Sequence, residues 1–321
     1  GAPEDYVAQI DAALTSDDPR LAQRRIEFAR ANNWDVRASQ IDAAIRGRTP
    51  LVSVIVLVYN GARYLPSFHR YFLKNAAWPN WELIYADNAS TDGSAGIISQ
   101  FAAGDERIKV LSCDANLGFA GGNNAAARQA NGDYLIFLNP DTIVTEGWIA
   151  RLVTLLERHP EAGLAAPVTN MSGMQSRIAT SYSNCAAMER FAADLARGKF
   201  GETLDIPAAP LLCAAVRRET WREVGELDER FRVGMFEDDD YCQRIRSAGL
   251  KILTAEDCFI HHFGGGSFRQ LADSEASAIF NANRSLYEQK WGVRWQAHQM
   301  RPGVAPVDSV PRTDPVSFFL D

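Results

Sequence analysis

The sequence predicts an α/β fold, in which a Rossmann-like, mostly parallel sheet is flanked by helices and carries a helical extension before it and a helix after it. Strand-like and helix-like segments alternate from residue 51 to residue 158. The first strand-like run, LVSVIVLV at Leu51–Val58, is rich in β-branched residues and is typical of a strand buried on both faces. Such alternation produces parallel strands joined by right-handed crossovers. The length of 321 residues agrees with one large α/β domain plus appended pieces.

The individual elements follow from the spacing of apolar residues and from turn residues. After the first strand we expect strands at Trp81–Ala86, Arg107–Ser112 and Asp133–Leu138, and helices at Ala62–Ala77, Asp92–Ala103, Phe119–Ala130 and Trp148–Arg158. Beyond Gly163 the pattern loosens. There we expect strands at Leu211–Arg218 and Lys251–Thr254, and helices at Glu237–Ala248 and Ser274–Trp291.

The two ends of the chain differ from this central part. Residues 1–48 have a helical pattern, and Ser16-Asp17-Asp18-Pro19 predicts a helix start because a capping side chain precedes a proline in the first turn. This segment is too small to bury a core alone. Residues 297–321 are proline-rich and lack periodicity, which predicts a tail or linker. The predicted boundaries are therefore 1–48, 49–296 and 297–321.

Composition and charge exclude several classes of protein. The net charge of −7 gives no general attraction to nucleic acid or to an anionic membrane surface. The longest apolar run, Val54–Tyr59, is far shorter than the ~20 residues of a membrane-spanning helix. Five cysteines without CxxC spacing argue against a zinc ribbon or a disulfide framework. We expect a cytoplasmic protein, with the inner face of the membrane as an alternative location.

Polar residues follow the predicted strands, where open parallel sheets bind ligands. Asp87 ends the second strand and could accept hydrogen bonds from a base or ribose, or simply form an Asx turn. Asp141 follows Asn139-Pro140 at the end of the fourth strand, and a carboxylate beside a diphosphate is a natural Mg²⁺ or Mn²⁺ site. The segment Asn116–Ala126 supplies glycines near a helix start, but its spacing is not the dinucleotide fingerprint, which excludes a nicotinamide-dependent oxidoreductase.

The helix that starts at FEDDDYC, Phe236–Cys242, carries four acids in its first turn. These acids suit the helix dipole, which is the simplest explanation for them. Helical spacing nevertheless puts Asp238 at the head of the inward face, where an acid is a general-base candidate, with Glu237 in support. The same spacing predicts that Asp240 pairs with Arg244 and that Asp239 faces solvent.

Two adjacent histidines, His261 and His262, precede three glycines. Neighbouring residues on a strand point to opposite faces, so one site can take only one of these histidines. The glycines Gly264–Gly266 make a ligand or lid role plausible.

Six segments in order together resemble the inverting glycosyltransferases of family 2, with the GT-A fold, and most closely their rhamnosyltransferase-like branch. They are VSVIVLVYN (Val52–Asn60), DNASTDGS (Asp87–Ser94), NLGFAGGNN (Asn116–Asn124), GDYLIFLNPDT (Gly132–Thr142), FEDDDYCQRIRSAG (Phe236–Gly249) and HHFGGGSF (His261–Phe268). Each segment alone is weak evidence, whereas the ordered set is specific.

The resemblance implies a role for each matching residue. Asp141 matches the metal-binding aspartate, and Asn139 stands where the family often has a second acid, which puts strict metal dependence in doubt. His262 best matches the histidine that completes the metal site, with His261 as the second choice, and Asp238 matches the catalytic base. The residues expected around the nucleotide are Tyr59, Asn60, Asp87, Asn88, Asn116, Gly118, Gly122 and Asn139.

The implied reaction is an inverting transfer from a nucleoside-diphosphate sugar to a hydroxyl of a glycan acceptor in bacterial surface polysaccharide assembly. The leading donor by analogy is dTDP-rhamnose, the acceptor can be lipid-linked, and the implied cofactor is Mg²⁺ or Mn²⁺. Residues 167–215 are irregular in pattern, and we expect the sugar hydroxyls to be read by Asn170, Ser172 and Gln175 from this stretch and by Asp240.

Other functions stay open at this point. A degenerate, non-catalytic module that binds glycan or nucleotide is one alternative, against which the intact acids argue. A nucleotidyltransferase is another, but the first strand is followed by only one arginine, Arg63, instead of a basic glycine-rich loop. Phe28–Ile45 resembles the closing helix of a GT-B domain, so the chain is either a module of a multidomain polymerase, with other catalytic modules as partners, or carries a helical extension.

Overall fold

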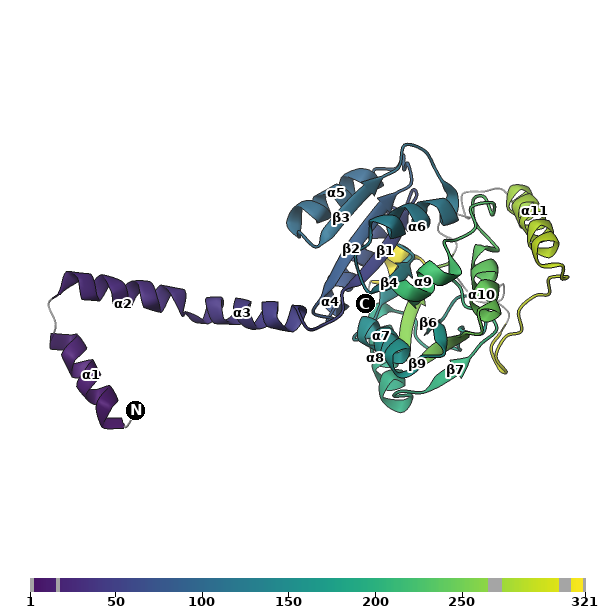
Figure 1. The fold of residues 1–321 in the computed structure, drawn as a ribbon. Helices are drawn as coiled ribbons and strands as arrows, with labels where there is room; N and C mark the ends of the chain where they lie inside the picture. The colour runs from purple at the N-terminus through teal and green to yellow at the C-terminus, as the bar shows by residue number, and fades with distance from the viewer. Residues whose placement is uncertain (1–2, 16–17, 265–272, 306–312, 320–321) are drawn as a thin grey trace. The chain divides into compact units, whose positions relative to one another are not determined.

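A nine-stranded sheet lies at the centre of the unit Pro50–Asp321 in the computed structural model, which describes residues 3–15, 18–264, 273–305 and 313–319 (Figure 1). The strand order is β3-β2-β1-β4-β8-β6-β9-β5, and β7 also pairs with β9. The first four strands in this order, β3 (Ile108–Ser112), β2 (Trp81–Asp87), β1 (Val52–Val58) and β4 (Tyr134–Leu138), are parallel to one another. The predicted parallel strands are therefore confirmed.

Helices cover both faces of this sheet because β1 is apolar on both of its sides. Val52, Val54, Val56 and Val58 belong to one core, which α4 (Leu65–Asn75), α5 (Ser94–Gly104) and α7 (Trp148–Arg158) complete. Ile55 belongs to a second core with α6 (Gly118–Gln129), α9 (Arg218–Val224) and α10 (Glu237–Ser247). The alternation of faces along β1 thus sets the three-layer arrangement.

The other half of the sheet is mixed. β8 (Cys213–Arg217) runs antiparallel to β4 and to β6 (Ala162–Thr169), and β6 pairs in parallel with β9 (Lys251–His262). The short strands β5 (Thr142–Val144) and β7 (Thr203–Asp205) are antiparallel to β9. The predicted strand at Leu211–Arg218 is confirmed as β8, whereas the prediction that residues 167–215 are irregular holds only in part. The sequence-based prediction missed β6 and α8 (Cys185–Gly198), and it ended β9 eight residues too early, at Thr254 instead of His262.

The C-terminal part also differs from its prediction. After α11 (Asp273–Trp291), which lies beside α10 (Figure 1), residues assigned to a tail contact the sheet unit. Arg301 pairs with Glu256 at 2.6 Å, and Phe318 of α12 (Pro315–Phe318) is buried in an aromatic cluster. These two anchors explain why 297–321 is not a free tail, although a proline-rich sequence predicts one.

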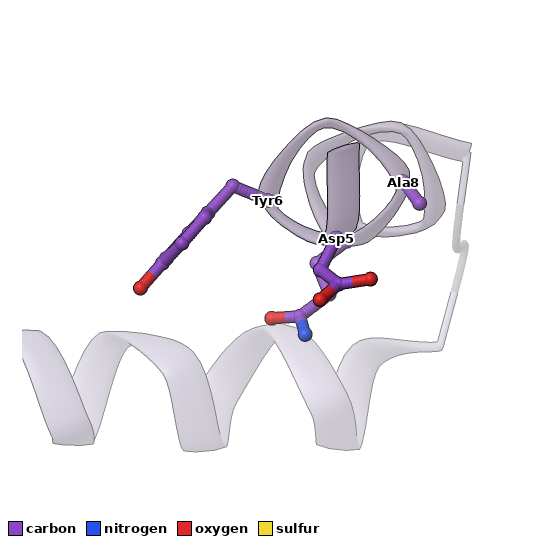
Figure 2. Close-up of a pocket in the computed structure, with 4 residues that line it drawn as sticks. Asp5, Tyr6 and Ala8 are labelled. Carbon is purple, nitrogen blue, oxygen red and sulfur yellow. The ribbon is translucent and has the colours of Figure 1, made fainter. Parts of the chain in front are cut away.

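The unit Gly1–Thr49 contains three helices in its described residues, α1 (Pro3–Thr15), α2 (Pro19–Ala31) and α3 (Trp34–Arg46). Asp18 caps α2 by accepting a hydrogen bond from the backbone nitrogen of Arg20 at 2.9 Å, which confirms the predicted helix start. A hollow of about 430 Å³ in this unit is lined by Asp5, Tyr6, Ala8 and Gln9 of α1 (Figure 2).

No helix in the described parts of the chain is both long and apolar enough to cross a membrane.

Candidate active site

The carboxyl ends of β1 and β2 meet in a small hydrogen-bonded turn. Asn60, in a left-handed conformation with φ of 50°, accepts a hydrogen bond on Oδ1 from the backbone nitrogen of Thr91 at 2.8 Å. The Ser90 hydroxyl accepts from the backbone nitrogen of Asn60 at 3.0 Å, and Asp87 accepts from that of Ser90 at 3.2 Å. The structure therefore brings Asn60 and Asp87 together, with Tyr59 half-buried beside them.

A second group of predicted nucleotide residues holds the start of α6. Asn88 donates from Nδ2 to Oδ1 of Asn116 at 2.8 Å and to the carbonyl of Gly118 at 3.2 Å. Gly118 has φ of 73°, and a Cβ there would lie 3.1 Å from the backbone nitrogen of Val233. These residues join the second strand end to the segment that precedes α10.

Gly122 has a different explanation from the one predicted. A Cβ at this position would lie 2.3 Å from Cδ1 of Leu57, so glycine is required for α6 to pack on β1. Packing accounts for Gly122 without any nucleotide contact.

Asp141 and His262 come together through strand pairing. Thr142 pairs with His262 in the antiparallel β5–β9 ladder, and the carbonyl of Asp141 accepts from the backbone nitrogen of Phe263 at 3.0 Å. As a result Nε2 of His262 lies 3.3 Å from Oδ2 of Asp141. Asn139 stands just before this pair, where its backbone nitrogen donates to Leu212 at 2.8 Å.

The opposite edge of the His262 ring is fixed by one short segment. Its Nδ1 lies 2.9 Å from the carbonyl oxygen of Met171, a partner that can only accept, so Nδ1 carries a proton and Nε2 is the ring nitrogen that lies next to Asp141. Asn170 accepts from the backbone nitrogen of His262 at 2.8 Å and donates to its carbonyl at 3.1 Å. Both ends of the Asn170 amide bind the backbone of His262, so Asn170 positions His262.

His261 points to the other face of β9, as the alternation along a strand requires. It is fully buried, stacks on Phe318 with ring centroids 4.4 Å apart, and its Nδ1 bonds the hydroxyl of Tyr182 at 2.7 Å. Burial, with a smaller contribution from His262, lowers its pKa to about 3. The choice between the histidines therefore falls on His262. The glycines Gly265 and Gly266 lie outside the described residues.

The Asp141–His262 pair fits a divalent cation in part. Within the described residues no three histidine, cysteine, aspartate or glutamate side chains form a cluster suited to a metal ion. Mg²⁺ and Mn²⁺ commonly take one or two protein ligands and complete their shell with water and substrate phosphates. One carboxylate and one correctly oriented imidazole therefore match that chemistry, with a thin protein shell.

The first turn of α10 follows a strained segment. Val233, Gly234, Met235 and Phe236 all have positive φ, at 69°, 145°, 75° and 76°. Residues other than glycine rarely adopt positive φ angles, and each such residue costs about 1–3 kcal/mol. Asn283 of α11 holds the segment by donating to the carbonyls of Gly234 at 2.9 Å and Met235 at 3.0 Å. The sequence-based prediction missed Asn283, because a single asparagine on an amphipathic helix gives no signal.

Two acids at the start of α10 have perturbed pKa values. Loss of hydration, reinforced by the charge of Asp239, raises the pKa of Asp238 to about 7, although its side chain keeps partial exposure. Glu237 is buried, and its Oε2 meets no hydrogen-bond partner among the described residues. Burial and the Asp238 charge raise the pKa of Glu237 well above its ordinary value. A carboxylate that titrates near neutral pH is suited to proton transfer.

Asp239 does not face solvent, contrary to its prediction. Its Oδ1 lies 2.8 Å from Nε2 of His298 and accepts from the indole of Trp295 at 3.3 Å. Both partners belong to the stretch after α11, and His298 was missed because that stretch was assigned to a tail. The charge of Asp239 raises the pKa of His298, against the opposing effect of burial.

Asp240 is also not a sugar-binding residue. Its side chain is fully buried, and it bonds Arg244 at 2.9 Å, as predicted, Lys290 at 2.6 Å and the indole of Trp291 at 3.0 Å. These contacts anchor α11 on α10, and they give both oxygens of the Asp240 carboxylate a partner within the protein.

One segment contacts both halves of the candidate site. Asn170 and Met171 hold His262, while Gln175 lines a cavity of about 190 Å³ together with His298, the partner of Asp239. These six residues span at most about 20 Å, so a short segment links the support of His262 to the cavity that His298 lines. Ser172 is buried within the segment and bonds Met174 and Ser176.

Comparison with known proteins agrees with this geometry. The profile of Glycosyl transferase family 2 matches residues 53–225. The chain is 24% identical over 258 residues to the uncharacterized protein y4gI of Sinorhizobium fredii, which covers 76% of this chain and 28% of that protein. It is 29% identical over 241 residues to the O-antigen biosynthesis protein RfbC of Myxococcus xanthus, which covers 68% of this chain and 18% of that one. The chain thus spans less than a third of the length of either relative.

A solved structure shares the fold. The crystal structure of GalNAc-T7 with UDP, GalNAc and Mn²⁺ superposes with a TM-score of 0.54 at 16% identity, over 67% of this chain and 44% of that one. The sheet order and the matching neighbour confirm the predicted GT-A fold. Since the family profile covers more than half of the sequence, the chain belongs to glycosyltransferase family 2.

Proposed function

We propose that this domain transfers a sugar from a nucleoside-diphosphate donor to a hydroxyl of a glycan acceptor, with inversion at the anomeric carbon. The supporting observation is that one segment, Asn170–Gln175, supports the Asp141–His262 pair at one end and at the other borders a cavity lined also by His298, the partner of Asp239. An acid that titrates near neutrality and a separate metal-binding pair are the two elements that a single displacement requires.

In this mechanism Asp238 acts as the base. Its carboxylate accepts the proton of the acceptor hydroxyl while the hydroxyl oxygen forms a bond to the anomeric carbon. The bond from that carbon to the diphosphate oxygen breaks, and its electron pair leaves with the nucleoside diphosphate. Because attack and departure occur on opposite faces, the configuration inverts and no covalent enzyme intermediate is needed.

The residues at the other end hold the leaving group. Asp141 and His262 would bind Mg²⁺ or Mn²⁺, which offsets the negative charge on a departing diphosphate when it is present. Met171 and Asn170 keep the imidazole in the orientation that this binding requires. Asn60 and Asp87, at the ends of β1 and β2, are the proposed contacts to the nucleoside.

The proposed pathway is the synthesis of a bacterial surface polysaccharide. The name of the Myxococcus xanthus relative, an O-antigen biosynthesis protein, supports this pathway. We propose dTDP-rhamnose as the first donor to test. The partners proposed are the donor, a glycan acceptor and further catalytic modules of the same polypeptide, for which the greater length of the relatives is the support.

The test is a donor panel. The chain is incubated with dTDP-rhamnose, UDP-glucose, UDP-N-acetylglucosamine and GDP-mannose, with Mn²⁺, against a set of octyl glycosides as acceptors. We expect release of nucleoside diphosphate with one donor and a product whose anomeric configuration, read by NMR, is opposite to that of the donor. Binding of nucleotides without turnover of any donor would favour the non-catalytic alternative, and a product of retained configuration would exclude the single displacement.

A further inference from the structure

Arg177 is a buried arginine without a counter-charge. Its side chain is only 2% exposed, and neither Nε nor Nη1 meets a hydrogen-bond acceptor among the described residues. Burial lowers the pKa of the guanidinium, and no described carboxylate opposes that lowering. A buried charge without a partner is costly, so such a group is expected to have an anion in the working state of the protein.

Other largely buried arginines of the same unit show what the fold ordinarily provides. Arg244 pairs with Asp240 and donates to the carbonyl of Val224 at 2.9 Å. Arg301 pairs with Glu256, and Arg217 donates to the carbonyl of Ala162 at 2.7 Å. Among the described residues Arg177 has contacts of neither kind, so nothing in that part of the chain compensates its charge.

The position of Arg177 relates it to the proposed donor site. It lies two residues after the segment Asn170–Gln175, and it forms a bridge with Thr169, the last residue of β6. Thr169 in turn is in register with Ile260 of β9, two residues before His262. Ladder neighbours lie about 5 Å apart, so the backbone of Arg177 is about two strand spacings from the β9 segment that ends at His262.

The face on which Arg177 lies agrees with a position near His262. The next residue, Ile178, packs against the aromatic cluster that contains Phe259, Phe263 and Phe318. Neighbouring residues of an extended segment point to opposite faces, which puts Arg177 on the face away from that cluster. His262 also lies on the face away from it, because His261 is the histidine that stacks on Phe318.

We propose that Arg177 binds an anionic oxygen group of the nucleotide-sugar donor, either a phosphate of the diphosphate or a carboxylate on the sugar. A planar guanidinium presents several donors at fixed angles and binds both groups in a bidentate manner. The inference rests on the proposed function, since it assigns a donor contact to the site described above.

Two variants of the full chain test the assignment. Arg177→Met keeps the length of the side chain and removes its charge, whereas Arg177→Lys keeps the charge without the planar fork. Arg197→Met, on the exposed end of α8, is the matched control. Unfolding temperatures and dissociation constants are measured with Mn²⁺ for UDP, dTDP, GDP, uridine, UDP-glucose and UDP-glucuronate.

We expect Arg177→Met without ligand to unfold at a higher temperature than the wild type, because an uncompensated buried charge has been removed. A purely structural arginine gives the opposite shift. If the anion is the diphosphate, Arg177→Met weakens the best-bound nucleoside diphosphate by about 10- to 100-fold and leaves uridine unchanged. If it is a sugar carboxylate, the nucleoside diphosphate binds as before and the preference of the wild type for UDP-glucuronate over UDP-glucose disappears.

Equal binding of every probe by the wild type and by Arg177→Met would overturn the assignment while leaving the proposed function intact. Failure of the wild type to bind any of these nucleotides would overturn the proposed function and this inference together.

Discussion

The Asp141–His262 pair and the first turn of α10 are the two ends of the candidate site, and the chain fixes them by different means. His262 pairs with Thr142, the residue after Asp141, in the antiparallel β5–β9 ladder, so backbone pairing brings Asp141 and His262 together. Asp238 instead follows a segment with positive φ that Asn283 of α11 holds in place. Sheet geometry is robust, whereas the acid end depends on contacts from more than forty residues downstream.

The two ends also differ in electrostatics. His262 has an acceptor on one ring nitrogen and a carboxylate near the other, which suits a cation. At the α10 end, four acids follow one another, and burial together with repulsion from the charge of Asp239 raises the pKa of Asp238 to about 7. The comparison teaches that one end is arranged to attract a cation and the other to hold a proton near neutral pH. The following changes test that division.

The largest effect is expected from Asp238→Asn, which removes the proposed base. Sugar transfer should fall by about 10²- to 10⁴-fold, because an amide cannot accept the proton. Nucleotide affinity should stay unchanged, since the metal end is untouched. Product formation measured by chromatography, alongside calorimetric titration with nucleoside diphosphate, checks both parts. Turnover like that of the wild type would exclude Asp238 as the base.

At the other end, Asp141→Ala should weaken binding of the nucleoside diphosphate by about 10- to 100-fold when Mn²⁺ is present. Without a metal, wild type and variant should bind alike. A second variant at this end is His262→Ala. Its matched control is His261→Phe, which changes the neighbouring histidine on the opposite face of β9. Identical titrations with and without Mn²⁺ in the wild type would contradict the metal assignment.

Asn283→Ala should damage the acid end selectively. It removes the donor to three carbonyls of the strained segment, at Arg232, Gly234 and Met235, and should lower the free energy of unfolding by about 1–2 kcal/mol. Transfer should fall further than this loss of stability explains, while metal-dependent nucleotide binding persists. Denaturant titration and initial rates measure the two effects. An unchanged rate would show that α11 does not position Asp238.

The smallest expected effect is on the pH dependence. Transfer needs Asp238 deprotonated, and its pKa is raised to about 7, so the rate should rise with pH and reach half its maximum near pH 7. Asp239→Asn removes a charge that raises this pKa, so the midpoint should move to lower pH. His298→Gln removes one that lowers it, so the midpoint should move to higher pH. Shifts of less than about one pH unit are expected. Shifts in the same direction for both variants would contradict this coupling.

Much of the fold could be predicted from local sequence. The β-branched run of β1, the turn residues after each strand and the Asp18-Pro19 helix start give short-range signals, and all three are confirmed. β6 escaped prediction because five of the eight residues of AGLAAPVT are alanine, glycine or proline, which carry no β preference of their own. Its strand forms because β8 and β9 lie on either side of it.

The candidate site, like the fold, could be predicted from the sequence only in part. The sequence by itself determined which residue types follow each strand, because this property depends on a few neighbouring positions. Only the tertiary structure decided that His262 and not His261 faces Asp141, that Asp240 is an internal anchor, and that His298 contacts Asp239. Each of these depends on the register between segments far apart in the chain, which no local pattern specifies.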